Sequence, residues 1–252
     1  TQVTLRVIPA ALPPHEAVTC ASTGHINVHE TGAVEATGHK VLSLPSPDGK
    51  VTPAMIQEIL DAHPDEHMVK PKMVYISNTT EIGTQYTKAE LEALSRICRA
   101  NGLFLFLDGA RLGAALTSSA NDLTMADIAS LTDVFYIGGT KNGALFGEAV
   151  VIMNPVLDED FRYMIKQRGG MLAKGWLLGI QFETLFTDGL FYEMASHATA
   201  MADKLRKGLE KKGVSFYSRS VSNQLFPIFS DETIARLSKD FSFNIQARMD
   251  ES

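Results

Sequence analysis

A single lysine, Lys141, lies in a glycine-rich loop between two apolar runs of the chain. These runs, at 134–137 and 149–153, are rich in β-branched residues, which is typical of buried strands. A lysine amine beside a protein core must be paired or lose its proton, and an amine with a lowered pKa can form a Schiff base. A surface lysine on a glycine-rich hairpin is the alternative. The loop alone leaves both interpretations open.

Polar side chains follow three predicted strands where each strand ends. They lie in segments 77–84, 108–111 and 138–141, and ligands of open α/β sheets bind at the carboxyl ends of strands. Asp108 could be a helix N-cap or a metal ligand of a phosphate-handling domain, but no P-loop motif precedes it. Asp108 and Lys141 on separate strand ends also suit a pyridoxal phosphate enzyme. In such enzymes a carboxylate keeps the pyridine nitrogen protonated and a lysine binds the aldehyde.

The composition excludes several classes of protein. The 252-residue chain has 45% hydrophobic residues, as globular proteins do, and a formal net charge of -6 with scattered basic residues, which argues against nucleic-acid binding. Cys20 and Cys98 lack the spacing of metal ligands or of a CxxC motif, so we expect buried thiols in a reducing compartment. No apolar run is long enough to span a bilayer. We therefore expect a cytoplasmic protein without a membrane partner.

Strand-like and helix-like segments alternate along most of the chain. The strand-like runs are continuously apolar, which indicates a mainly parallel sheet covered on both faces. Thr52 and Thr87 have the positions of helix N-caps. Residues 3–8 could begin a helix or a strand. We expect strands at 16–21, 40–44, 72–77, 103–107, 134–137 and 149–153, and helices at 53–60, 88–100, 127–131, 155–166, 176–199 and 198–211.

Four segments together resemble the threonine aldolase family of β-eliminating lyases, which are pyridoxal-phosphate enzymes. The resemblance covers nearly the whole chain, and the four segments occur in the family's order. They are His25-Ile-Asn-Val-His-Glu-Thr-Gly-Ala33, Asn78-Thr-Thr-Glu-Ile-Gly-Thr84, Leu107-Asp-Gly-Ala-Arg-Leu-Gly113 and Gly138-Gly-Thr-Lys-Asn-Gly143.

The resemblance implies a fold class and a reaction. The fold is α/β, of the aspartate aminotransferase type (fold type I), with a small C-terminal α+β domain. The reaction is cleavage of L-threonine or L-allo-threonine to glycine and acetaldehyde through a Schiff base of substrate and pyridoxal 5'-phosphate. The alternatives are another pyridoxal-phosphate β-eliminating lyase or aminotransferase, or a truncated, catalytically silent homologue. The family also implies a homodimer or homotetramer.

The resemblance also assigns roles to residues. Lys141 would form the Schiff base, Asp108 would pair with the pyridinium nitrogen, and His25 would stack on the pyridine ring; these three are the expected catalytic residues. Arg111 would bind the cofactor's 3-hydroxyl or the substrate carboxylate.

Three further residues are expected to bind the cofactor phosphate. Thr1 resembles the remnant of the family's phosphate-binding turn, Thr140 is next to the lysine, and Arg168 could reach a phosphate across a subunit interface, with Lys174 as the alternative. Leu172 stands where the family often has an arginine.

The segment with His25 and His29 raises two questions: whether it binds a metal, and whether it supplies the catalytic base. His25, His29 and Glu30 have helical spacing for metal binding, but they lack a further ligand of defined spacing, so we expect no metal. Thr80 stands where many family members have a histidine near the substrate hydroxyl. The base that removes the hydroxyl proton is therefore His29, Glu81 or an ordered water, and we favour water.

We expect two domains. Residues 1–200 would form the large cofactor-binding domain without its N-terminal part, and residues 201–252 a truncated C-terminal domain with strands at 214–217 and 224–229 and a helix at 231–238. If the polypeptide ended at Ser252, it would lack the family's late arginine and turn over poorly. Apolar positions nearly surround the helix expected at 176–199, which favours burial, with another subunit as one candidate partner.

Overall fold

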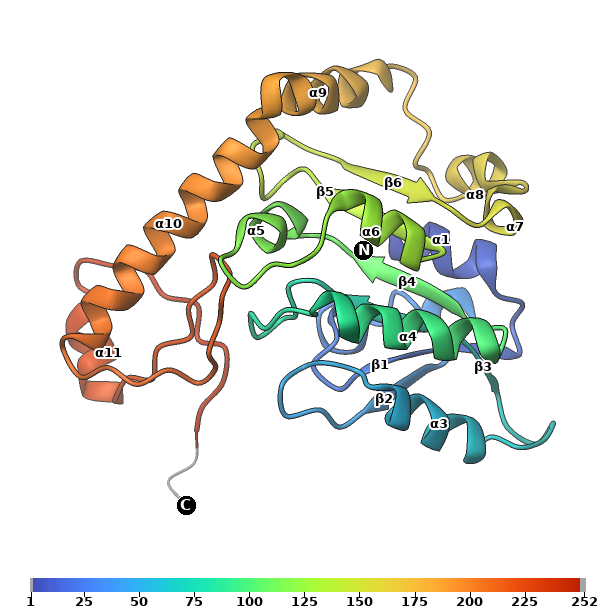
Figure 1. Ribbon diagram of the computed structural model, residues 1–252, viewed down its shortest axis with the longest axis horizontal. Coiled ribbons are helices and arrows are strands. Elements are labelled where there is room, and N and C mark those ends of the chain that lie inside the picture. The colour runs from blue at the N-terminus through green and yellow to red at the C-terminus, as the bar shows by residue number, and fades with distance from the viewer. Residues whose placement is uncertain (1, 250–252) are drawn as a thin grey trace.

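The computed structural model describes residues 2–249, and its centre is a six-stranded sheet with the order β2-β1-β3-β4-β5-β6 (Figure 1). β1 to β5 are parallel, and β6 pairs antiparallel with β5. The strands are β1 (Glu16–Ala21), β2 (Val41–Leu44), β3 (Lys70–Ser77), β4 (Phe104–Asp108), β5 (Val134–Gly138) and β6 (Glu148–Ile152). The predicted mainly parallel α/β sheet is confirmed. Its strand order brings the carboxyl ends of β3, β4 and β5 side by side.

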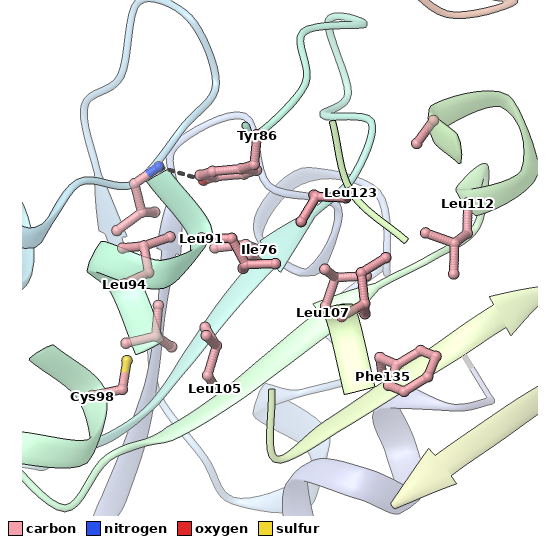
Figure 2. Close-up of a cluster of buried hydrophobic side chains, with 14 of the residues drawn as sticks. Ile76, Tyr86, Leu91, Leu94, Cys98, Leu105, Leu107, Leu112, Leu123 and Phe135 are labelled. Carbon is pink, nitrogen blue, oxygen red and sulfur yellow. Dashed lines mark hydrogen bonds between the residues drawn. The ribbon is translucent and has the colours of Figure 1, made fainter. Parts of the chain in front are cut away.

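Helices cover both faces of the sheet, which explains why the strands are continuously apolar. On one face, α3 (Pro53–Asp61), α4 (Lys88–Ala100) and α6 (Met125–Leu131) pack on alternate strand residues. Figure 2 shows this core, in which Leu91 and Leu94 of α4 face Ile76, Leu105 and Leu107 of the strands. The opposite face packs against α1 (Thr4–Ala11), α7 (Pro155–Asp158) and α8 (Phe161–Gln167).

The two predicted N-cap threonines begin helices. The Thr87 hydroxyl accepts a hydrogen bond from the backbone N–H of Glu90, and the Glu90 carboxylate accepts one from the backbone N–H of Thr87. This capping box satisfies two amide donors that the first turn of α4 leaves without helical partners. The same pair of bonds starts α6, and Thr52 caps α3 ahead of Pro53.

Two predicted helices are each interrupted. The expected helix at 176–199 is in fact α9 (Trp176–Phe186) and α10 (Leu190–Glu210), joined by a 3-10 turn, η2 (Thr187–Gly189). Asp188 and Gly189 have φ values of 51° and 75°, outside the right-handed helical region, so the chain turns there. The segment 155–166 is divided into α7 and α8 in the same way by Asp160, with φ 59°. Figure 1 shows α10 running from α9 past α5 (Leu112–Thr117) towards α11 (Asp231–Leu237).

The C-terminal segment has less regular structure than the sequence predicts. The two strands expected at 214–217 and 224–229 are wrong, because only an isolated antiparallel bridge joins Phe216 to Pro227. Proline has no N–H to continue a ladder. The helix expected at 231–238 is confirmed as α11.

Three further predictions concern the burial of α9, the state of the two cysteines and the absence of a membrane span. α9 is not buried within this chain, since Trp176 is 60% exposed and Ile180 is 49% exposed, and burial against another subunit stays a prediction. Cys20 and Cys98 are buried and free, as expected. Within residues 2–249, no helix combines the length and the apolar character needed to cross a membrane.

Candidate active site

Two glycines bring the loops after β4 and β5 into contact. A Cβ atom on Gly109 would lie 1.9 Å from the carbonyl oxygen of Tyr136, and one on Gly138 would lie 2.4 Å from the carbonyl oxygen of Ala110. The Gly138 N–H donates a hydrogen bond of 2.9 Å to the Gly109 carbonyl oxygen. Because no side chain fits between these backbones, the polar residues after the two strands start from neighbouring positions.

Asp108 ends β4 with a buried carboxylate, 6% exposed, that accepts three hydrogen bonds. The Tyr75 hydroxyl donates to one oxygen, Oδ2. The Tyr136 hydroxyl donates to Oδ1 at 2.5 Å, and the backbone N–H of Ala110 donates to the same atom at 2.9 Å. These hydrogen bonds replace part of the hydration that the carboxylate loses when it is buried.

Lys141 lies in the loop between β5 and β6, and its amine has an altered environment. Its pKa is lowered from the usual lysine value because nearby protein atoms desolvate the amine and because the Arg111 guanidinium repels its charge. Asp108 and Glu148 act in the opposite direction. The side chain as a whole still reaches solvent. A lowered pKa increases the fraction of the amine that can attack an aldehyde.

Arg111 directly precedes α5 and is half-buried. Burial lowers the pKa of its guanidinium, while the charges of Asp108 and Glu81 raise it. Within residues 2–249, no carboxylate forms an ion pair with this side chain at 4.0 Å or less. Its N–H groups are therefore available to bind an anionic group of a ligand.

His25 begins α2 (His25–Val28) and is held by two acidic residues. Its ring atom Nδ1 lies 2.7 Å from Oε1 of Glu30, whose side chain is 2% exposed, whereas the His25 side chain is 37% exposed. Its backbone N–H donates a hydrogen bond of 2.8 Å to Oε1 of Glu81, which also accepts one of 2.6 Å from the Ser77 hydroxyl. The imidazole thus has one ring edge fixed and part of its surface open.

The electrostatic coupling of these residues indicates that they form one cluster. Burial raises the pKa of Glu81, and the negative charge of Asp108 adds to that shift. The negative charges of Glu30 and Glu148 both act to raise the pKa of Lys141. The structure therefore brings Lys141, Asp108 and Arg111 together.

The other predicted site residues have different surroundings, and one of them lies outside the described part of the chain. Thr140 is exposed, and its hydroxyl acts to lower the pKa of Glu148, against the effect of burial. Arg168 is exposed at the end of α8, where its backbone carbonyl accepts a hydrogen bond from Arg6. Thr1 lies outside residues 2–249. Thr80 is buried and bonded to the hydroxyl of Thr84 at 2.6 Å.

The histidines do not assemble the metal site that their spacing allowed. The rings of His25 and His29 are 5.3 Å apart between centroids, and Glu30 contacts Nδ1 of His25. In the described part of the chain, no three His, Cys, Asp or Glu side chains are grouped as metal ligands would be.

Three residues of the cluster were absent from the sequence prediction: Tyr75, Tyr136 and Glu148. Glu148 accepts a 2.7 Å hydrogen bond from the backbone N–H of Gly139, and burial raises its pKa. The two tyrosines are part of apolar strands, where they resemble ordinary core residues. A phenol in a buried strand needs a polar partner, and this is the signal that could have identified them.

The family comparison covers most of the chain. The model of the β-eliminating lyase family matches residues 4–232. A low-specificity L-threonine aldolase of a Pseudomonas species is 38% identical over 196 residues, which are 76% of this chain and 56% of that protein. The enzyme of the same description from Pseudomonas aeruginosa is 34% identical over 233 residues, 91% of this chain and 67% of that protein. The chain thus spans about half to two thirds of these relatives' length.

Solved structures agree with the fold. A structure of Leishmania major threonine aldolase is 55% identical, with a TM-score of 0.96 over 99% of this chain and 73% of that one. A mutant aspartate aminotransferase of Thermus thermophilus is 17% identical, with a TM-score of 0.68 over 88% of this chain and 57% of that one. At such low identity, the aminotransferase shows a shared fold alone.

Proposed function

The chain belongs to the β-eliminating lyase family, and from this membership we propose that it is a pyridoxal-phosphate-dependent lyase that cleaves L-threonine or L-allo-threonine to glycine and acetaldehyde. Its fold is that of the aspartate aminotransferase type. The observation that carries the proposal is the grouping of Lys141, Asp108 and Arg111 at adjacent strand ends. The threonine aldolases among its relatives supply the choice of substrate.

The chemistry of these side chains fits pyridoxal phosphate. The cofactor needs an amine that is unprotonated in part, and burial and Arg111 lower the pKa of Lys141. It needs a carboxylate for its ring nitrogen, for which Asp108 is the candidate. Arg111, without a carboxylate partner within residues 2–249, would bind an anionic group, and the open part of the His25 imidazole would cover the ring. Thr140, Arg168 and Thr1 remain proposed contacts of the phosphate.

When bound, pyridoxal phosphate withdraws electrons from the α-carbon of the attached amino acid. The protein's own residues would prepare that reaction. Lys141 would hold the aldehyde until the substrate amine replaces it, and Asp108 would stabilise a proton on the ring nitrogen. Burial raises the pKa of Glu81, which supports a role in accepting the proton of the substrate's β-hydroxyl, directly or through a water molecule.

A homodimer or homotetramer is also part of the proposal. Trp176, Leu177 and Ile180 expose apolar side chains on α9, by 60%, 41% and 49%. Burying such a surface against a second copy would be favourable. We place this assembly in the cytoplasm, because two buried free thiols suit a reducing compartment.

Borohydride reduction of the purified chain with pyridoxal phosphate tests the proposal. We expect mass spectrometry to find the reduced cofactor on the peptide that contains Lys141. The Lys141→Ala variant should lose this adduct and the visible absorbance, whereas Lys211→Ala, at an exposed lysine after α10, should keep both. Full aldolase activity in Lys141→Ala would refute the assignment.

Product analysis separates the proposed reaction from its alternatives. Incubation with L-threonine should yield glycine and acetaldehyde in equal amounts. Release of ammonia or of a keto acid would instead indicate a sister lyase or an aminotransferase. A defined oligomer that forms no adduct with the cofactor would indicate a silent homologue.

A further inference from the structure

The Asp108 carboxylate lies between two phenols that come from the neighbouring strands. Tyr75 of β3 donates to Oδ2, and Tyr136 of β5 donates to Oδ1 at 2.5 Å. Tyr75 is 1% exposed and Tyr136 is 8% exposed. Each carboxylate oxygen therefore has its own buried phenol donor.

The sheet itself sets this arrangement. Tyr75 pairs with Phe106 in the register of β3 and β4, and Asp108 lies two residues beyond Phe106 on the same face. The Phe106 ring contacts both phenol rings, with centroid distances of 5.4 Å to Tyr75 and 6.4 Å to Tyr136. Because all three rings belong to strands of the core, the phenol hydroxyls have little freedom to turn away from the carboxylate.

Both phenols remain protonated and act as donors. Burial raises the pKa of Tyr75 and of Tyr136, and the negative charge of Asp108 raises both further. Other charged groups also act on Tyr75, Asp108 and Tyr136. The positive ones are Arg111 and Lys141, and the negative ones are Glu81, Glu148 and Glu30.

We propose that Tyr75 and Tyr136 are positioning residues that hold Asp108 as a carboxylate hydrogen-bond acceptor, so that the proton on the cofactor's ring nitrogen would stay on the nitrogen. The part that concerns the nitrogen rests on the proposed function. The part that concerns the carboxylate applies to the protein without cofactor as well.

The physical reason is the competition between two positions of one proton. In a buried site, a neutral carboxylic acid beside a neutral pyridine avoids the desolvation of two charges. Hydrogen bonds to a carboxylate favour its ionised form. Two phenols and the Ala110 N–H therefore shift the balance towards a carboxylate and a protonated ring, and the protonated ring is the better electron acceptor.

Nuclear magnetic resonance with pyridoxal phosphate labelled with ¹⁵N in the ring tests the position of the proton. In the wild-type chain, we expect the nitrogen to resonate at the pyridinium position. In Tyr75→Phe and Tyr136→Phe it should shift towards the position of unprotonated pyridine, and further in the double variant. A double variant that binds the cofactor and keeps the wild-type resonance would overturn the proposal.

The matched control is Tyr86→Phe. Tyr86 is also 1% exposed, but its hydroxyl accepts a hydrogen bond from the backbone N–H of Val51 and lies in the core on the opposite face (Figure 2). This variant removes a buried phenol hydroxyl without touching Asp108. A shift of the nitrogen resonance in Tyr86→Phe as large as in Tyr136→Phe would show that the effect is general loosening of the core, against the proposal.

The pH dependence of thermal stability tests the carboxylate without any cofactor. Hydrogen bonds that favour an ionised carboxylate stabilise the fold at higher pH, and this contribution is lost as the carboxylate takes up its proton at lower pH. An aspartate ordinarily takes up its proton at about pH 4, so the loss of Tm in Tyr136→Phe should be larger at about pH 6 than at about pH 3, and the loss in Tyr86→Phe should be the same at both. In an Asp108→Asn background, the pH dependence of the Tyr136→Phe effect should disappear.

The two experiments separate failure of this inference from failure of the proposed function. If the wild-type chain forms no adduct with pyridoxal phosphate, the proposed function fails, and the melting experiment still decides whether the phenols act on Asp108. If the adduct forms and the loss of Tm in Tyr136→Phe is independent of pH, the inference fails and the proposed function stands.

Discussion

Replacing Phe106 with leucine is the most informative test of the packing beneath the candidate site. Phe106 is 0% exposed in the middle of β4, and its ring contacts Tyr75 edge-on and Tyr136 at a tilt. Leucine keeps an apolar side chain at this position and the β4 pairing. It removes the aromatic contacts and part of the volume.

The expected loss in the free energy of unfolding follows from these two contributions. Each aromatic pair is worth about 0.5–1.5 kcal/mol beyond its buried area, and the longer contact with Tyr136 belongs at the lower end. The unfilled space beside leucine adds to this loss. Together they predict a loss of roughly 2–3 kcal/mol, a large part of the about 5–15 kcal/mol that stabilises a typical domain.

Urea unfolding followed by circular dichroism measures this loss, and Phe104→Leu is its matched control. Phe104 begins the same strand on the same face, is only half-buried, and has the Lys72 amine 5.1 Å from its ring centroid. Such a partly exposed contact is worth about 0.5–1 kcal/mol, so the control should lose about 1 kcal/mol or less. If Phe104→Leu were as destabilising as Phe106→Leu, the ring cluster would not be a centre of stability and the reasoning would be wrong.

Three other predictions concern separate parts of the chain. Thr87→Ala removes the N-cap of α4 and should lower the free energy of unfolding by about 1 kcal/mol in urea, whereas Thr87→Ser should restore most of it. Cys20 and Cys98, whose pKa values burial raises to about 12, should react with iodoacetamide only after unfolding; labelling of the native protein would contradict their burial. Lys141, with its lowered pKa, should be acetylated faster than Lys211 near neutral pH, and this advantage should shrink as pH rises and both amines lose their protons; equal rates near neutrality would argue against the shift.

Much of the fold could be predicted from local sequence. The strands of the sheet were expected close to their observed positions, because continuous apolar runs bounded by turn residues are a local signal. The helix starts at Thr52 and Thr87 were expected because an N-cap depends on a side chain and an amide only a few residues apart. The break at Asp188 was missed, since the apolar pattern continues through it and a positive φ is rare outside glycine.

The candidate site was predictable in part for the same reason. Lys141, Asp108 and Arg111 each follow a strand in a loop with glycines, and parallel strands bring such loops to one edge of the sheet. Their roles in binding a cofactor remain predictions. The C-terminal strands were predicted wrongly, because strand formation depends on a partner that the sequence of one segment does not specify.

The sequence by itself determined which segments form strands and helices and which polar residues follow them, because those signals act over a few residues. Only the tertiary structure decided that Tyr75 and Tyr136 share the Asp108 carboxylate and that Glu81 accepts a hydrogen bond from the backbone N–H of His25. In the chain, Tyr75 is 33 residues from Asp108 and Tyr136 is 28 residues from it. Contacts between residues so far apart follow from strand order and register, which are settled by the packing of the whole sheet and not by any one of its strands.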